Sequence, residues 1–473
     1  MSGLAERNGG RVGLALLAAI LALGLGLRTG EAWDGRAAVF DAAAYATIAA
    51  NLDRGDGFTL GPGATQPASN YSPGLPLLAA GIYQVTGGVH ERTARLVLAL
   101  IGTVAALFTY LIGRRLSGPA AGLIGAAAIA IYPALLEYQG MLMGEPLAAT
   151  LLSAAVLATL WADRPRHGDP ARGSCHGAGG PAGEVYVLDP PAPCHPRIRW
   201  LVPGALFGAL ALVRPEYIGV ALLISLVVLA KDWRVDWRRS LGRAGLLLVG
   251  VAVVVVPWTV RNAIALDRFV PVSTGGGQVL FAGTYLPSDG DPEKVGAEVV
   301  ARHPGLFGPH AVWDLRLEQI LARLAARRYP GLETDKALSR MGREQLWDDI
   351  GDEPLEYAGF VARKVARIWS HGPRDVMRQP VWELLHWALV AFGLIGLGVL
   401  AVQRRWEALL LAAIFVAITA ISALLVASPR RVLVMMPLVA ALAGTGMVSL
   451  ATSLGARRRP VGPAPPPEPA QDL

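Results

Sequence analysis

Long apolar runs separated by short polar loops follow one another along most of the chain. They occupy residues 12–27, 96–113, 120–136, 141–162, 200–213, 217–230, 244–258, 384–402, 408–427 and 432–450. An α-helix needs roughly 20 apolar residues to cross a bilayer core of about 30 Å, and most of these runs approach that length. A further run at 75–85 is too short to span and predicts a re-entrant or interfacial helix. The pattern predicts an all-α polytopic membrane protein.

Composition and charge support this class and add an orientation. Hydrophobic residues make up 53% of the chain and charged residues only 17%, which excludes an ordinary soluble enzyme. The net charge is +7, and the basic residues gather in every second loop, as in Arg114-Arg115 and Arg404-Arg405. The positive-inside rule then places both termini in the cytoplasm. Because the basic surplus reports topology, we expect no nucleic-acid partner.

The chain divides into four predicted parts. These are an N-terminal transmembrane catalytic module 1–262, an extracytoplasmic loop region 263–380, C-terminal transmembrane helices 381–455 and a disordered Pro-rich tail 456–473. The module contains the first outer loop 29–91 and a flexible cytoplasmic insert 163–199. We interpret the first run as a retained helix, not as a cleaved signal peptide.

Two sequence features allow more than one interpretation. Cysteine occurs only in the insert, as Cys175-His176 and Cys194-His195, and adjacent pairs do not match the usual spacing of zinc ligands. A reduced, solvated loop is the simpler interpretation. The stretch 357–369 has one apolar and one basic face, which indicates either an interfacial helix on the membrane or a helix packed on its neighbours.

The first outer loop carries the main catalytic candidate. Asp41 follows the first apolar run and precedes Tyr45 by four residues, so Asp41, Tyr45 and Ile48 share one helical face. A Tyr- and Pro-rich segment beginning at Tyr71 follows. A carboxylate just outside the membrane can take a proton from an attacking hydroxyl. The alternative role for Asp41 is that of a helix N-cap.

Other acids and arginines stand at the same, outer ends of apolar runs. A charge within a membrane segment is costly, so these residues are functional candidates. They are Glu145, Arg214, Glu216, Arg261 and Arg430. An arginine fork binds phosphate in a bidentate manner, and a second carboxylate can orient an acceptor or hold a divalent cation.

Each of these residues also has a structural explanation. Glu145 precedes Pro146 and could be a first-turn helix charge. Arg214 and Glu216 could pair with each other, and Arg430 could anchor its helix at the interface. Their shared side of the membrane favours a common site.

The order and spacing of several motifs resemble the C-type superfamily of polytopic glycosyltransferases. They are Asp41-Ala-Ala-Ala-Tyr45, NYSPGLPLL, GEPLAATLL, LVRPEY, PWTVRNAIALDRFVPVSTGGG and SPRRVLVMMPLVA, within residues 12–452. Within it, the chain is most similar to family 39, the relatives of protein mannosyltransferases and lipid A aminoarabinose transferases. The resemblance implies about 10–13 transmembrane helices, with amphipathic helices in the first outer loop and a small extracytoplasmic loop region.

The resemblance also implies an activity. A sugar would move from a polyprenyl-phosphate or related lipid-linked donor to a hydroxyl of a lipid, glycan or protein acceptor at the extracytoplasmic face of the inner (plasma) membrane. Asp41 would be the base and Glu145 the second acid. Substrate binding would fall to Arg261, Arg214, Arg430, Glu216, Tyr45 and Tyr71. A transporter or flippase, or a ligase, for a lipid-linked glycan is the alternative.

The first loop departs from the family pattern in a way that concerns metal binding. Many relatives have Asp-Glu or Asp-x-Asp there, whereas Asp41 is followed by Ala42, Ala43 and Ala44. This argues against a tightly held metal, and we assign no metal ligand. No cofactor is certain, and a divalent cation, Mg²⁺ or Mn²⁺, stays open.

Overall fold

The computed structural model describes residues 2–38, 41–61, 67–163, 198–289, 291, 293–308, 310–370 and 372–457. The predicted insert and Pro-rich tail, with both Cys-His pairs, lie almost wholly outside these residues. Within them the chain is helical, and the one β-bridge joins Thr59 to Pro67. The predicted fold class, an all-α polytopic membrane protein, is confirmed.

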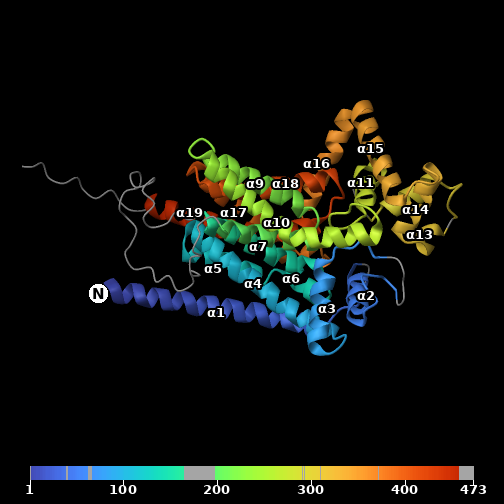
Figure 1. Cartoon of the computed structure of the whole chain (residues 1–473). Helices are drawn as coiled ribbons and strands as arrows, with labels where there is room; N and C mark the ends of the chain where they lie inside the picture. The colour runs from blue at the N-terminus through green and yellow to red at the C-terminus, as the bar shows by residue number, and fades with distance from the viewer. Residues whose placement is uncertain are drawn as a thin grey trace, which may run out of the picture.

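Seven described helices are long and apolar enough to cross a membrane. They are α1 (Ser2–Asp34), α4 (Glu91–Ser117), α7 (Gly144–Ala162), α10 (Trp237–Leu266), α17 (Pro380–Val402), α18 (Trp406–Leu424) and α19 (Pro429–Arg457). They form the elongated bundle of Figure 1. An eighth span results if α5 (Pro119–Ala130) and the following short helices count as one, although they meet at 53°.

Within the described residues, the number of helices long and apolar enough to span is therefore lower than the number of apolar runs in the sequence. Residues 120–136 were expected to form one helix, but the chain breaks between α5 and α6 (Pro133–Glu137) and continues as the 3₁₀ turn η1 (Tyr138–Gly140). Proline removes a backbone donor and starts a new helix there. The apolar helices α8 (Leu201–Val213), preceded by the turn η3 (Ile198–Trp200), and α9 (Tyr217–Asp232) are shorter than the usual span.

Helix α19 forms the centre of the bundle. It packs on α17, α5, α4 and α7, and 83% of its most apolar window is inside the protein. Close approach depends on small residues: a Cβ on Gly444 would lie 2.1 Å from the backbone oxygen of Ala121. Packing through small residues is typical of membrane helices. It fixes the axis of α19 and so the position of its N-terminal end, where Arg430 stands.

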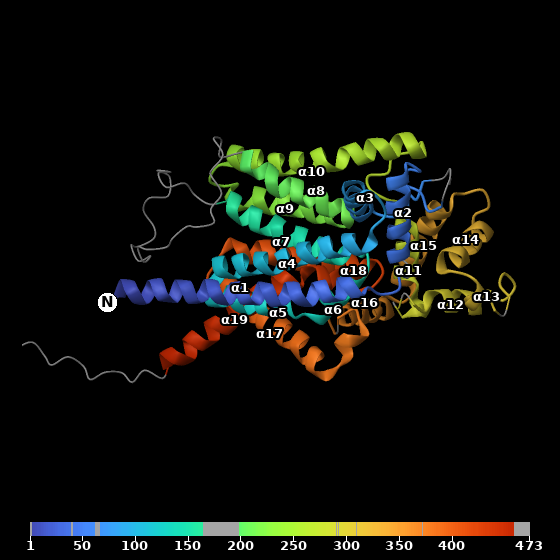
Figure 2. The ribbon, with the colours of Figure 1, turned by 90° about the horizontal axis from the view of Figure 1, so that it is seen from below.

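The helices of two long loops form a cap over one end of the bundle, as Figures 1 and 2 both show. The first loop supplies α2 (Asp41–Arg54) and α3 (Gly74–Thr86). The long loop supplies α11 (Gly276–Thr284), η4 (Leu286–Ser288), α12 (Val295–Arg302), α13 (Ala311–Asp314), α14 (Leu317–Arg328), α15 (Thr334–Asp352), α16 (Pro354–Ser370) and η5 (Asp375–Arg378). Buried Phe281, Leu321 and Leu338 give the cap an apolar core of its own.

Helix α16 connects this cap to the bundle. Its buried residues are Tyr357, Phe360, Lys364 and Ile368, and the helix packs on α18 and α19. The apolar face predicted from the sequence is therefore largely covered by protein, which matches the alternative of a helix packed on its neighbours.

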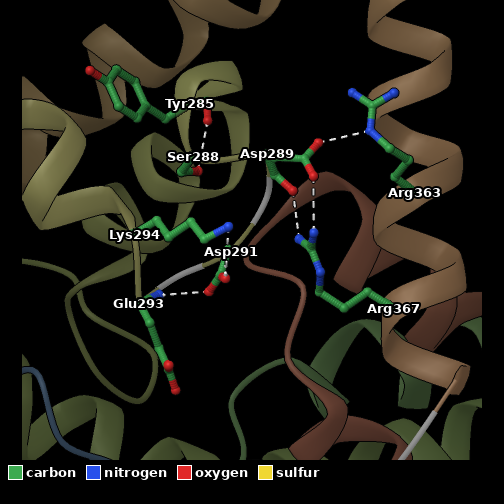
Figure 3. Close-up of polar contacts among 8 residues, drawn as sticks. All are labelled: Tyr285, Ser288, Asp289, Asp291, Glu293, Lys294, Arg363 and Arg367. Carbon is green, nitrogen blue, oxygen red and sulfur yellow. Dashed lines mark hydrogen bonds and ion pairs between the residues drawn. The ribbon is translucent and has the colours of Figure 1, made fainter.

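Figure 3 shows how Asp289 joins the turn after η4 to α16. The Arg363 Nε donates to Asp289 Oδ1 at 2.8 Å, and Arg367 donates to Oδ2 at 3.1 Å and to the backbone oxygen at 2.5 Å. Asp289 also has a left-handed backbone, with φ of 51°. The hydrogen bond from Arg363, with Arg367 adding to it, holds the pKa of the Asp289 carboxyl below its usual value.

Replacing Asp289 by asparagine should loosen this connection, because asparagine tolerates the left-handed backbone but carries no charge. We expect faster amide hydrogen exchange in 286–291 at pH 7. Because the folded pKa is depressed, the difference should be complete above the ordinary aspartate pKa of about 3.9 and shrink as the pH falls below it. Asp291→Asn is the control, since Asp291 accepts a hydrogen bond from the Glu293 backbone amide and forms an ion pair with Lys294, both in its own loop (Figure 3). Equal exchange in both variants would contradict the assignment.

Candidate active site

Four charged residues from distant parts of the chain meet at the end of the bundle that carries the helical cap. Asp41 is the first residue of α2, and Glu145 stands in the first turn of α7. Arg214 follows the last residue of α8, and Arg430 stands in the first turn of α19. Glu145, Arg214 and Arg430 each lie where an apolar helix begins or ends, whereas Asp41 begins the short helix α2.

Arg430 bridges the two acids. Its Nε donates to Glu145 Oε1 at 2.5 Å, and its NH1 donates to Asp41 Oδ2 at 3.0 Å. Arg214 donates through NH2 to the same Glu145 oxygen at 2.5 Å. Glu145 is therefore shared by two arginines, whereas the described contacts give Asp41 one.

The two acids differ sharply in exposure. The Glu145 side chain is 0% exposed and that of Asp41 is 41% exposed. A buried carboxylate is costly unless it is paired and hydrogen-bonded. Two guanidinium groups pair with Glu145 Oε1, whereas Oε2 is buried without a hydrogen-bond partner among the described residues. Burial alone would disfavour charge on Arg214, but Glu145 outweighs it and raises the pKa of Arg214 above its ordinary value. Glu145 is thus an interior anchor, and Asp41 is the accessible acid.

Glu216 joins a neighbouring pair. Its Oε1 lies 3.5 Å from Nε of Arg431, and Arg431 also donates to the backbone oxygen of Val426. Arg214 and Glu216 therefore have separate partners, Glu145 and Arg431, and do not form the isolated pair that the sequence left open.

The two predicted tyrosines stand together beside Asp41. The rings of Tyr45 and Tyr71 are 5.8 Å apart and edge to face. Burial raises the pKa of Tyr45, Arg214 opposes the shift, and the negative charges of Asp41 and Glu145 add to it. The Tyr45 hydroxyl therefore stays protonated and is a neutral hydrogen-bond donor next to the acids.

Arg261 is the candidate that the structure does not bring to the acids. Its guanidinium carbon lies 4.8 Å from the centre of the Trp258 ring and 5.6 Å from that of Phe58. Its NH1 donates to the Asn262 side chain at 3.1 Å. Arg261 is thus a cation stacked on aromatic rings near the C-terminal end of α10, apart from the Asp41–Arg430–Glu145 bridge.

Sequence reasoning missed Tyr138. Its ring centre lies 6.0 Å from the guanidinium carbon of Arg430 and 5.6 Å from that of Arg374. Arg374 in turn donates to Glu137 at 2.6 Å. Cations within about 6 Å of an aromatic face are attracted to it, so Tyr138 helps to hold Arg430. The sequence feature that could have pointed to Tyr138 is Pro133, because it breaks the apolar helix shortly before this residue.

Lys364 was also missed. Its side chain is fully buried, and Nζ donates to the backbone oxygen of Gly283 at 2.6 Å. Burial, with the nearby charges of Arg431 and Arg367, lowers the pKa of Lys364 to about 7. The sequence placed it on the basic face of α16, where it resembled a solvated charge.

Lys364→Met should stabilise the protein in a pH-dependent way. From about pH 7 up to the ordinary lysine pKa of about 10.4, the unfolded chain binds a proton that the folded chain does not, so the stability of the wild type rises with pH. The advantage of the methionine variant should be complete below pH 7 and shrink toward pH 10. Apparent melting temperatures in detergent measure it. An advantage that did not vary with pH would contradict a depressed pKa.

Comparisons with known proteins agree with the fold. The model of the family described as oligosaccharyl transferase STT3, N-terminal, matches residues 65–140, the segment from before α3 to η1. A search of curated protein sequences finds no match to this chain.

Solved structures extend the likeness to nearly the whole chain. The archaeal oligosaccharyltransferase AglB from Archaeoglobus fulgidus, in complex with an inhibitory peptide and a dolichol-phosphate, overlays with a TM-score of 0.56 at 15% identity, covering 95% of this chain and 51% of that one. The Archaeoglobus fulgidus oligosaccharyltransferase in complex with Zn and sulfate gives 0.53 at 14%, covering 93% and 50%. ArnT from Cupriavidus metallidurans, bound to undecaprenyl phosphate, gives 0.40 at 14%, covering 95% and 79%.

The two Archaeoglobus fulgidus structures, with TM-scores above 0.5, show that the chain shares their helical fold. It spans about half the length of the archaeal enzyme.

Proposed function

We propose that the protein is a membrane glycosyltransferase that moves a sugar from a polyprenyl-phosphate or related lipid-linked donor to an acceptor hydroxyl. The observation that carries this proposal is the Asp41–Arg430–Glu145 bridge, which combines an exposed carboxylate with a guanidinium group held by a buried one. The fold likeness to an oligosaccharyltransferase supports it. The acceptor is a lipid, glycan or protein.

The residues divide the chemistry between them. Asp41 accepts the proton of the acceptor hydroxyl as its oxygen attacks the anomeric carbon. A carbon–oxygen bond forms on one face, and the bond to the lipid phosphate breaks on the other, so the configuration inverts. The phosphate leaves with the bonding electrons, and Arg430 is the cation closest to Asp41 that can neutralise it. Tyr45, Tyr71, Arg214 and Glu216 line the same region, and Arg261 provides a cation farther along the outer surface.

The site spans two of the predicted parts of the chain. Asp41, Glu145 and Arg214 belong to the module 1–262, whereas Arg430 belongs to the helices 381–455. We therefore propose that the catalytic unit includes both, with the loop region 263–380 as its cap. The charge distribution supports cytoplasmic termini and a site on the extracytoplasmic side of the plasma membrane.

The donor set does not fit a tightly held Mg²⁺ or Mn²⁺. A relative of similar fold has been solved in complex with Zn and sulfate. Here a guanidinium group, Arg430, joins the two acids, and the described part of the chain has no group of three or more His, Cys, Asp or Glu side chains that could hold a metal. Mg²⁺ prefers near-octahedral oxygen ligands. Asp41 and Glu145 alone do not supply them, and no step is assigned to a metal.

The test is transfer in purified membranes from a polyprenyl-phosphate donor labelled in the sugar. We expect label in an acceptor and release of free polyprenyl phosphate, with activity retained in EDTA. Movement of intact labelled lipid across the membrane without cleavage would instead favour a flippase. Transfer of a preassembled glycan, and not of single sugars, would favour a ligase.

A further inference from the structure

We propose that Arg430 holds Asp41 inactive in the free protein and releases it when the donor phosphate binds. This inference rests on the proposed function and concerns how its base is controlled. In the structure Oδ2 of the exposed acid is occupied, because Arg430 NH1 donates to it at 3.0 Å. That hydrogen bond must be removed before Oδ2 can accept a proton from an acceptor.

The two ends of the bridge are unequal. At the inner end, Arg430 Nε lies 2.5 Å from Glu145, whose side chain is 0% exposed and also binds Arg214. At the outer end, NH1 meets Asp41 at 3.0 Å, and that carboxylate is 41% exposed. A competing anion from outside therefore displaces Asp41 first and leaves Glu145 in place. Glu145 acts as the fixed anchor, and Asp41 as the exchangeable partner.

A lipid phosphate is the competitor that fits this geometry. Phosphate oxygens bind guanidinium groups in a bidentate manner, with charge-assisted hydrogen bonds about twice as strong as neutral ones. Arg430 carries one positive charge and already shares Glu145 with Arg214. Once NH1 turns to phosphate, Asp41 Oδ2 loses its hydrogen-bond donor and is open to the acceptor hydroxyl. The base thus becomes ready to accept a proton only when the donor is bound, which protects against unproductive chemistry.

The experiment is a double-mutant cycle on binding, with full-length protein in nanodiscs. The probes are unlabelled polyprenyl phosphate and, in a separate arm, inorganic phosphate alone. Asp41→Asn should tighten binding by about fivefold, because Arg430 no longer has to leave a charged partner. In the Arg430→Ala background the same Asp41→Asn change should alter the affinity by less than about twofold. The inorganic-phosphate arm shows whether the phosphate group alone suffices or the lipid is required.

A second background guards against a poorly folded protein. Arg430→Lys keeps a positive charge opposite Glu145. Its compact ammonium group lacks the planar fork of donors with which a guanidinium group can bind two anions at once. The effect of Asp41→Asn should be reduced there as well. Of Arg430→Ala and Arg430→Lys, the background used for the cycle is the one whose melting temperature and monodispersity are closer to those of the wild type.

The outcomes separate this inference from the proposed function. Equal tightening by Asp41→Asn in all backgrounds would show a general charge effect and overturn the release of Asp41, and so would unchanged or weaker binding in the single variant. If sugar transfer depends on Asp41 but the cycle shows no coupling, the function stands and the control mechanism falls. If the cycle is coupled but no donor is cleaved, the phosphate competition stands and the transferase assignment falls.

Discussion

Asp41→Asn is expected to lower sugar transfer by about 10²–10⁴-fold, the range typical of a lost general base. Asparagine keeps the shape of the side chain and can still accept a hydrogen bond from Arg430, but it cannot take the acceptor's proton. Because the side chain is partly exposed, we expect an unchanged melting temperature. Initial rates from the labelled donor, measured at equal amounts of folded protein, give the result.

The matched control for this loss is Asp56→Asn. Asp56 lies in the same outer loop and pairs with Arg54 at 3.3 Å. It has no contact with Arg430, so its removal should leave transfer near the wild-type rate. Full activity in the Asp41 variant, or an equal loss in the control, would remove Asp41 from the role of base.

Glu145→Gln should disrupt the structure as well as the activity. It would leave Arg214 and Arg430 without the buried anion that both bind at 2.5 Å. Removing one partner of a buried ion pair typically costs about 3–5 kcal/mol, because the remaining charge stays buried and unpaired. We expect a clear fall in apparent melting temperature and loss of transfer, since Arg430 also loses its anchor.

Two further variants test the cause of that destabilisation. Glu145→Asp keeps the charge on a shorter side chain and should recover part of the stability. Glu216→Gln removes an acid from the looser pair with Arg431, at 3.5 Å, and should have the smaller effect. If Glu145→Gln melted like the wild type, Glu145 would not be the anchor described here.

The acids and arginines of the site could be predicted because each interrupts an apolar pattern. Asp41, Glu145, Arg214 and Arg430 all stand at run ends on the side that the positive-inside rule makes extracytoplasmic. Their pairing could not be predicted, because Asp41 and Arg430 are 389 positions apart and meet only through helix packing. By charge and position alone, Arg261 was as good a candidate as Arg214 and Arg430.

The residues that escaped prediction look ordinary in sequence. In the sequence, Tyr138 resembles an interfacial aromatic residue, and Lys364 resembles a residue on the polar face of an amphipathic helix. Their roles follow from neighbours that no local pattern encodes: Arg430 and Arg374 beside the tyrosine, and the Gly283 backbone oxygen at the lysine. The break between α5 and α6 was visible as Pro133, but the apolar run continued across it.

Arg28, which is buried in α1, lies at that break. Arg28 donates to the backbone oxygens of Ile129 and Ala130, where α5 ends, at 2.8 and 3.1 Å. A cation within the membrane costs about 2.5–3.5 kcal/mol on insertion scales. During synthesis the first helix emerges about a hundred residues before these acceptors exist. We therefore expect α1 to remain at the translocon until α5 has been synthesised. The order of membrane insertion would then depend on the single side chain of Arg28.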